Sequence, residues 1–414
     1  MLMIEFILWF ISFVSLFVSL VWFSTFYLSR SSIVEGKNAL LYPKVTIGVP
    51  AFNEEKTIAK TLKSLLKLDY PKEKLEIIVV DDGSTDRTYE TVKAFLESEN
   101  ADNFILIRKE NGGKATALNT ALKKASGEFF GCVDADSTIS EDSLKKITPN
   151  FIDSNVGAVV STIRVAQEKN FLQKMQRFEY ILSSFFRKLF TSMESLYVTT
   201  GVLSVYRKSV IIGLGGFDEN NLTEDLEMGL RLNYNKYRVV VEMGSKTYTE
   251  VPSTIKAFWR QRIRWLRGHV HNTLKYREMF LNKEYGFMGV FQLPLHMFSP
   301  ILMILSATII SYGFLNGIYW FLLKLSVAPN SLFVIDLPTI RDMLLSIKFP
   351  IIFPLFIIIM LGLFMYGKAH KYLKEKWTYP LVFIVFLAIY PLILSYIWIV
   401  AIVEEYFGMK RVWR

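Results

Sequence analysis

Long apolar blocks alternate with charged stretches and divide the chain into membrane-like ends and a globular middle. The first block, Phe6 to Leu28, carries no charged residue and is long enough to cross roughly 30 Å of hydrocarbon as a helix. A cleaved signal peptide would start with basic residues and have a shorter apolar core. Here the only early charge is Glu5, and the basic residues follow the block at Arg30, Lys37 and Lys44. This order predicts an uncleaved anchor with its N-terminus outside and its basic flank in the cytoplasm.

Apolar blocks near the end of the chain predict about three further membrane spans. They lie near residues 298–323, 350–367 and 380–403. Aromatic residues typical of membrane interfaces stand at their ends, namely Tyr319, Trp320, Trp377 and Tyr379. The loop between the last two blocks is basic and therefore favours the cytoplasm, with Lys368, Lys371, Lys374 and Lys376. Three crossings would leave the C-terminus outside, but the basic tail argues for the inside, with Lys410, Arg411 and Arg414.

The middle of the chain alternates short apolar runs with helical patterns. The apolar runs predict strands at 45–50, 75–80, 104–108 and 128–134. The helical patterns between them lie near 55–66, 86–96 and 114–125. Alternation of this kind predicts an α/β domain with a parallel sheet covered on both faces.

Polar residues follow each of the predicted strands at its carboxyl end. They are the segments Ala51–Glu54, Asp81–Ser84, Asn111–Lys114 and Asp134–Asp136. Ligands of open α/β sheets bind beyond the carboxyl ends of the strands. We therefore expect these four segments to share one binding edge.

Asp134 and Asp136 form a D-x-D pair at the end of the fourth predicted strand. Residues two apart on an extended chain point the same way, so both carboxylates can face one hard divalent cation. Such a cation offsets the charge of a diphosphate leaving group. The motif also occurs by chance, so it predicts a metal site only together with the motifs around it.

The run Asp81-Asp82-Gly83-Ser84-Thr85-Asp86 has two readings. Gly83 allows a sharp turn, and Ser84 or Asp86 could cap the next helix. A capping turn does not explain why two acids end an apolar strand. We expect one of Asp81 and Asp82 to bind a nucleotide and the other a metal.

Thr223-Glu224-Asp225 opens a helical pattern and predicts a catalytic carboxylate. Thr223 suits an N-cap, and an acid in the first turn complements the helix dipole. That structural explanation covers Glu224 better than Asp225. A sugar hydroxyl is a poor nucleophile, and a carboxylate can take its proton as it attacks. Asp225 is the expected base.

Gln261, Arg264 and Trp265 share one helix face because they stand at i, i+3 and i+4. An arginine can hold a phosphate, and an indole offers a flat surface to a sugar ring. The alternative is a basic helix that only touches lipid headgroups. We expect that role for Arg260, Arg262 and Arg267, with Phe258 and Trp259 dipping into the interface.

The net charge of +10 is compatible with nucleic acid or with anionic lipid. The basic residues cluster beside apolar blocks and no nucleic-acid-binding motif is evident, so lipid is favoured. Cys132 is the only cysteine, which excludes an intrachain disulfide and fits a reducing compartment.

Taken in order, the motifs resemble family 2 glycosyltransferases of the GT-A fold. The nearer resemblance is to the membrane-integrated branch with a Q-x-x-R-W signature, which includes cellulose, hyaluronan, chitin-oligosaccharide and poly-N-acetylglucosamine synthases. The matching stretches are VPAFNEE, VVDDGSTD, NGGKATALN, VDADS, LTEDLEMGLRL and QRIRW. Phe52 departs mildly from a more common Tyr.

The resemblance implies a role for each matching residue. The donor's base and ribose would lie against Pro50, Ala51, Phe52 and Glu54, with Asp81 and Asp82 holding the nucleotide. Lys114 would face the nucleotide-sugar, while Asp134 and Asp136 would bind its diphosphate and Mg²⁺ or Mn²⁺. Asp225 would be the base, with Glu224 beside it. Gln261, Arg264 and Trp265 would lie over the diphosphate and acceptor.

We therefore expect an inverting transferase that is multi-pass in the plasma membrane, with a cytoplasmic catalytic domain. The best donor is UDP-N-acetylglucosamine, followed by UDP-glucose, and the product is a polysaccharide made processively. The alternatives are single transfer to a lipid and, from another class, a non-catalytic transporter or scaffold. The expected parts are an anchor at 1–30, a GT-A domain at 31–252, interfacial helices at 253–295 and membrane helices at 296–414.

Overall fold

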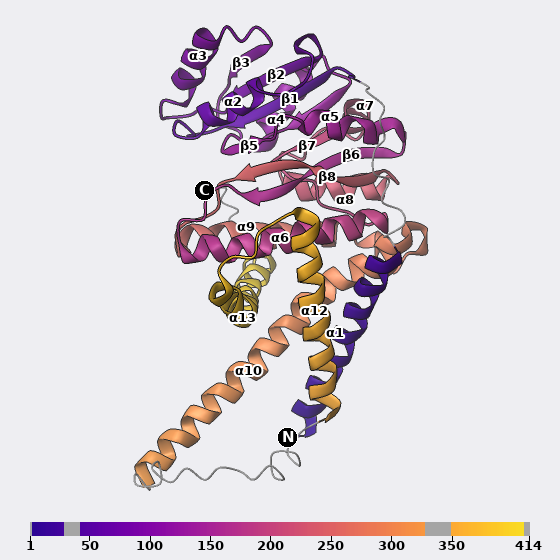
Figure 1. The fold of residues 1–414 in the computed structure, drawn as a ribbon, viewed down its shortest axis with the longest axis vertical. Coiled ribbons are helices and arrows are strands. Elements are labelled where there is room, and N and C mark those ends of the chain that lie inside the picture. Colours follow the sequence, from indigo (N-terminus) through magenta and orange to yellow (C-terminus); the bar gives the residue numbers. More distant parts are fainter. Residues whose placement is uncertain (1, 29–41, 328–348, 410–414) are drawn as a thin grey trace.

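An eight-stranded sheet lies above a layer of helices, and apolar helices extend from that layer (Figure 1). The computed structural model describes residues 2–28, 42–327 and 349–409. The sheet order is β3-β2-β1-β4-β7-β6-β8-β5. The predicted basic flank and tail residues Arg30, Lys37, Lys410, Arg411 and Arg414 lie outside the described residues.

The first half of the sheet matches the predicted strands. Its strands are β1 (Val45–Ala51), β2 (Leu75–Asp81), β3 (Phe104–Arg108) and β4 (Phe129–Cys132). All three pairings among them are parallel. The helices between them are α2 (Ile58–Leu66), α3 (Thr88–Glu99) and α4 (Lys114–Lys124).

The second half of the sheet corrects the prediction of a purely parallel sheet. Its strands are β5 (Ser137–Ile139), β6 (Val156–Val165), β7 (Ser204–Arg207) and β8 (Arg238–Thr249). β7 pairs antiparallel with both β4 and β6, and β5 pairs antiparallel with β8. Only β6 and β8 are parallel in this half. The sheet is therefore mixed.

Two apolar cores cover the two faces of the sheet. One contains buried side chains of α2 and of α5 (Ser143–Ile147). The other contains side chains of α4, α7 (Lys208–Gly213) and α8 (Glu224–Tyr234). Cys132 is buried in the second core.

Below the sheet, α6 (Phe171–Ser192) and α9 (Ile255–Lys275) form a layer against the apolar helices (Figure 1). Only α9 was predicted as an interfacial helix. A third core joins this layer to α1 (Leu2–Leu28), α12 (Phe349–Leu373) and α13 (Pro380–Tyr406). α10 (Leu293–Val327) packs beside it.

The predicted lipid contacts of α9 are partly wrong. Arg262 is 3% exposed and binds Glu179 at 2.6 Å, and Arg267 is 5% exposed and binds both Glu404 and Glu405. Phe258 is buried in the third core. These groups are buried because α6 supplies the partner of Arg262, while α13 supplies the partners of Arg267 and packs against Phe258. Of the three arginines, Arg260 alone remains exposed, as expected.

In the part of the chain that the structure describes, four helices are long and apolar enough to cross a membrane, namely Met3–Leu28, Met288–Val327, Pro350–Leu373 and Pro380–Tyr406. Three of them extend away from the α6–α9 layer, while α13 lies directly beneath it and is seen nearly end-on (Figure 1). Contacts with the layer run along α13, from Tyr390 on Glu179 at 2.6 Å to Glu404 on Arg267 at 3.1 Å. α13 therefore stays beside the layer over this length.

Candidate active site

The carboxyl ends of β1, β2 and β4 meet the starts of α4 and α8 at one edge of the sheet. Lys114, the first residue of α4, joins the predicted motifs there. Its Nζ lies 2.6 Å from Asp134 Oδ1 and 3.0 Å from Glu224 Oε1. The D-x-D and T-E-D motifs, ninety residues apart in the chain, are therefore bridged by one ammonium group.

The loop before β7 completes this side of the site. The Asp134 amide donates to the Gly201 carbonyl at 3.0 Å. A Cβ at Gly201 would lie 2.4 Å from Lys114 Nζ and 2.6 Å from Asp134 Oδ2, so a larger residue cannot fit without displacing both. The Thr199 hydroxyl donates to the Asp225 carbonyl at 2.6 Å. The loop carries no acid or base, so the sequence offers little local evidence for its role.

Acidic side chains crowd together at the site. Burial, the Asp134 charge and the Glu54 charge raise the pKa of Asp136 to about 7. Burial, together with the charge of Asp225, also raises the pKa of Glu224. Burial alone would lower the pKa of Lys114, but Asp134, Glu224 and Asp225 together raise it well above its ordinary value. The site thus has more negative charge than its one ammonium offsets.

This excess of carboxylate suits a hard cation. Among the residues that the structure describes, no group of three His, Cys, Asp or Glu side chains could hold a metal ion. Asp134 and Asp136 are two oxygen donors, and Mg²⁺ characteristically binds through one or two carboxylates plus substrate phosphates. The donor set therefore fits a divalent cation that is completed by a diphosphate.

Asp81 and Asp82 are buried, and both carboxylates interact with groups of the protein itself. Asp82 accepts hydrogen bonds from Lys109 Nζ at 2.6 Å and the Gly113 amide at 2.7 Å. Asp81 pairs with Arg108 at 3.2 Å and accepts from the Ser84 amide. In this state Asp82 holds the loop that positions Lys114. Their nucleotide-binding role stays a prediction.

The turn after β2 resembles the predicted capping turn only in part. α3 begins at Thr88, and Asp86 Oδ1 accepts from the Thr88 amide at 3.0 Å. Asp86 Oδ2 accepts from the Glu55 amide at 3.2 Å, and Ser84 Oγ accepts from the Asn53 amide at 3.0 Å. These bonds tie the turn to the segment after β1, where Phe52 and Glu54 are expected to hold the base.

The T-E-D turn is fixed by α9. Thr223 stands at the N-cap of α8, but its hydroxyl does not cap the helix, which corrects that detail of the prediction. Instead it accepts from Asn272 Nδ2 at 3.0 Å. Arg264 Nη1 donates to the Leu222 carbonyl at 3.3 Å. The Q-x-x-R-W helix therefore holds the turn that carries Asp225, and no sequence motif pointed to the contribution of Asn272.

Gln261, Arg264 and Trp265 lie on α9 beneath the acids. Gln261 Oε1 is buried without a hydrogen-bond partner in the described part of the chain. Trp265 stacks on the Arg262 guanidinium, whose carbon lies 4.4 Å from the centre of the indole ring. The predicted face is thus present, and Arg262 supports the indole from within the fold.

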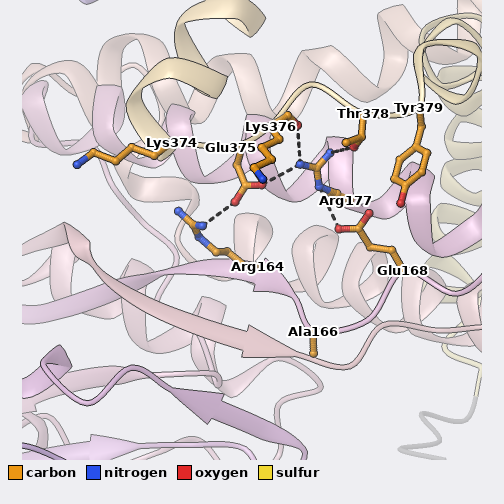
Figure 2. Close-up of a pocket in the computed structure, with 9 residues that line it drawn as sticks. All are labelled: Arg164, Ala166, Glu168, Arg177, Lys374, Glu375, Lys376, Thr378 and Tyr379. Carbon is orange, nitrogen blue, oxygen red and sulfur yellow. Dashed lines mark hydrogen bonds and ion pairs between the residues drawn. The ribbon is translucent and has the colours of Figure 1, made fainter.

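A separate polar cavity of about 530 Å³ lies where the α12–α13 loop meets β6 and α6 (Figure 2). Arg177 binds Glu168 at 3.1 Å and Glu375 at 2.8 Å, and Arg164 binds Glu375 at 2.7 Å. None of the predicted site residues lines this cavity. Its ion pairs connect the α12–α13 loop to β6 and α6.

Part of the chain is similar to known glycosyltransferases. Residues 46–215 match the family model "Glycosyl transferase family 2". The chain is 32% identical over 265 residues to poly-beta-1,6-N-acetyl-D-glucosamine synthase of Staphylococcus aureus, covering 63% of this chain and 62% of that enzyme. It is 34% identical over 245 residues to the probable glycosyltransferase YdaM of Bacillus subtilis, covering 58% of each. The chain thus spans somewhat less than two thirds of these relatives.

The overall fold has a solved counterpart. The mannosyltransferase PcManGT of Pyrobaculum calidifontis, solved with GDP-Man and Mn²⁺, aligns with a TM-score of 0.63 and 20% identity. The alignment covers 97% of this chain and 100% of that one. At this identity the likeness establishes the fold alone, a GT-A domain with its flanking helices.

Proposed function

We propose that the protein transfers a sugar from a nucleotide-sugar to a glycan, with inversion, because residues 46–215 match the family model "Glycosyl transferase family 2". The observation that carries this proposal is the Lys114 bridge between Asp134 and Glu224. It brings a diphosphate-binding pair and a candidate base to one place. Inverting transfer needs both groups on opposite sides of the reacting sugar carbon.

Asp225 is the proposed base. Its backbone is held by the Thr199 hydroxyl, and its own Oδ1 accepts from the Leu226 amide at 2.8 Å. These bonds orient the carboxylate to take the proton of an acceptor hydroxyl. The attacking oxygen then forms the new bond as the bond to the diphosphate breaks. Lys114, the predicted donor-facing residue, would exchange its present contact with Asp134 for the nucleotide-sugar and keep its contact with Glu224.

A divalent cation, Mg²⁺ or Mn²⁺, would offset the charge of the leaving diphosphate when held by Asp134 and Asp136. Without the cation, the negative charges of Asp134 and Glu54 around Asp136 would oppose the approach of a diphosphate. Arg264, near the start of α8, adds a fixed positive charge on the acceptor side. Glu224 balances Lys114 and is proposed to keep that ammonium directed at the donor.

The relatives suggest the donor and product. The staphylococcal enzyme is named for a polymer of N-acetylglucosamine, which supports UDP-N-acetylglucosamine and processive synthesis here. UDP-glucose is the second choice. A lipid acceptor that receives one sugar remains the alternative, because the same donor site would serve both reactions.

A donor screen tests the function. The purified chain in nanodiscs would receive UDP-N-acetylglucosamine, UDP-glucose or GDP-mannose with Mg²⁺ or Mn²⁺, and nucleotide release and product mass would be measured. Release with one donor and a ladder of products supports a polymerase, whereas one sugar on a lipid supports the alternative. No release with any donor, with lipids and oligosaccharides present, would contradict the proposal.

The helices suggest a topology in a plasma membrane. α1, α10 and α12 extend from the α6–α9 layer and would cross the bilayer, whereas α13 stays against the layer (Figure 1). The exposed apolar side chains of α13, such as Leu381, Ile384 and Tyr396, would face acyl chains of the cytoplasmic leaflet. We propose that the catalytic domain and the C-terminus are both cytoplasmic, which agrees with the basic tail.

A further inference from the structure

One carboxylate joins α6, α9 and α13 beneath the sheet. Glu179 of α6 accepts a hydrogen bond from Arg262 Nη2 of α9 at 2.6 Å and another from the Tyr390 hydroxyl of α13 at 2.6 Å. Both bonds end on the same oxygen, Glu179 Oε2. Arg262 and Tyr390 are each 3% exposed, so water has little access to either donor. Glu179 therefore fixes the position of Arg262 relative to Tyr390.

Arg262 in turn supports the indole of Trp265. Its guanidinium carbon lies 4.4 Å from the centre of the indole ring and 4.9 Å from the centre of the Phe258 ring. These residues stand at i, i+4 and i+7 on α9, so they share one helix face. A guanidinium is planar and stacks on aromatic faces. Phe258 is buried and Trp265 is partly exposed, so Arg262 supports an indole that still has surface open to contact.

The bond to Glu179 restricts how the guanidinium of Arg262 can turn. Arg262 Nη2 is paired with Glu179, while Arg262 Nε is buried with no hydrogen-bond partner among the described residues. A planar group that is held at one edge keeps its plane in one orientation. The indole of Trp265 lies against that plane and shares its orientation. Tyr390 holds the same oxygen of Glu179, so it links α13 to the indole.

We propose that Glu179 and Tyr390 are positioning residues that set the orientation of Trp265 from α6 and α13. This inference rests on the proposed function, in which Trp265 is the predicted surface for the acceptor sugar. Lys114 and Asp134, which are predicted to face the donor, bind each other at 2.6 Å and lie outside this path. A displacement of α13 would therefore turn the indole and leave the donor side of the site in place. It gives α13 a role beyond its contact with lipid.

Fluorine NMR of the full chain in nanodiscs tests the positioning directly. The tryptophans would be replaced by 5-fluorotryptophan, and Trp265→Phe would assign the Trp265 resonance. Tyr390→Phe removes only the hydroxyl, and Glu179→Gln keeps the shape of the side chain without its charge. We expect the Trp265 resonance to shift and broaden in both variants, because the indole loses its fixed support. A resonance that is unchanged in both would overturn the proposal.

Transfer kinetics test the consequence of the positioning. UDP-N-acetylglucosamine would be the donor and a β-1,6-linked N-acetylglucosamine tetramer the acceptor. Tyr390→Phe should raise the acceptor KM by about threefold to tenfold, as expected for the loss of one hydrogen bond, and leave the donor KM unchanged. A residue that acts through Trp265 has no further effect once the indole is gone. Tyr390→Phe should therefore not change the acceptor KM of Trp265→Phe, and additive effects would overturn the proposal.

Tyr396→Phe is the matched control. Tyr396 also belongs to α13, but it is 60% exposed and its ring lies 5.5 Å from that of Trp259. The control should keep the wild-type Trp265 resonance and acceptor KM. A Trp265 resonance that shifts in Tyr390→Phe, with no transfer by the wild type from any donor, would overturn the proposed function and support the positioning. Transfer by the wild type, with a resonance that is unchanged in Tyr390→Phe and Glu179→Gln, would do the reverse.

Discussion

Gly268 lies so close to Thr223 that a Cβ at this glycine would come within 2.2 Å of the threonine hydroxyl oxygen. The Q-x-x-R-W helix and the turn before Asp225 are therefore in direct contact, and the glycine is what permits it. We predict that Gly268→Ala displaces this turn. A displacement of up to 1 Å can lower the rate by as much as about a hundredfold. The rate of sugar transfer at saturating donor would measure this loss.

Gly362→Ala is the control for this prediction. Gly362 is also helical, and a Cβ there meets nothing within 4 Å. It should transfer sugar at the wild-type rate. If Gly268→Ala did the same, the close packing of α9 would have no bearing on the position of Asp225.

Arg267 is predicted to stabilise the fold. Its guanidinium joins α9 to Glu404 and Glu405 at the end of α13. Arg267→Met removes the cation that pairs with both carboxylates and leaves their charges uncompensated by it. This should lower the free energy of unfolding by on the order of 3 kcal/mol. Thermal unfolding in detergent would show the loss, and the exposed Arg260→Met should show almost none. A change in affinity for anionic vesicles, with stability intact, would instead support the lipid role expected from the sequence.

Local sequence patterns predict the parallel half of the sheet but not the partners of Arg267. The parallel half of the sheet was predictable because β1 to β4 are short apolar runs separated by helices, a local pattern. Their polar carboxyl ends predicted that Lys114 and Asp134 lie at one edge, whereas Asp225 was predicted separately, from the T-E-D motif. The partners of Arg267 lie 137 and 138 residues away, and no local pattern connects them.

The antiparallel half of the sheet was missed for a related reason. β7 has only four residues and finds its partners in β4 and β6, both far along the chain. α6 carries apolar and charged residues in a helical pattern, but nothing local tells a membrane-facing helix from one that covers a sheet. The roles of Thr199, Gly201 and Asn272 depend on distant contacts as well.

The topology makes a labelling prediction. Met409→Cys should react with a membrane-impermeant maleimide only after cells are opened, because α12 is proposed to return the chain to the cytoplasmic side and α13 to stay there. Pro350→Cys, at the far end of α12, should react in intact cells. The native Cys132 is buried and should stay unlabelled. Labelling of Met409→Cys in intact cells would mean that α13 crosses the membrane.

Removal of divalent cations should abolish transfer. We expect EDTA to stop nucleotide release, and added Mg²⁺ or Mn²⁺ to restore it. Asp134→Asn and Asp136→Asn should each weaken metal binding, seen directly as a larger EPR signal of free Mn²⁺ at equal protein and metal concentrations. Full activity in EDTA would show that Lys114 and Arg264 alone offset the charge of the diphosphate.

The most direct test of the central claim is sugar transfer by Asp225→Asn, with donor binding measured on the same sample. Asparagine keeps the shape of the side chain but cannot take a proton. The account predicts transfer reduced by about a thousandfold, the usual contribution of a general base, with unchanged affinity for the nucleotide-sugar. Transfer at the wild-type rate in Asp225→Asn would contradict the assignment of the base and the mechanism built on it.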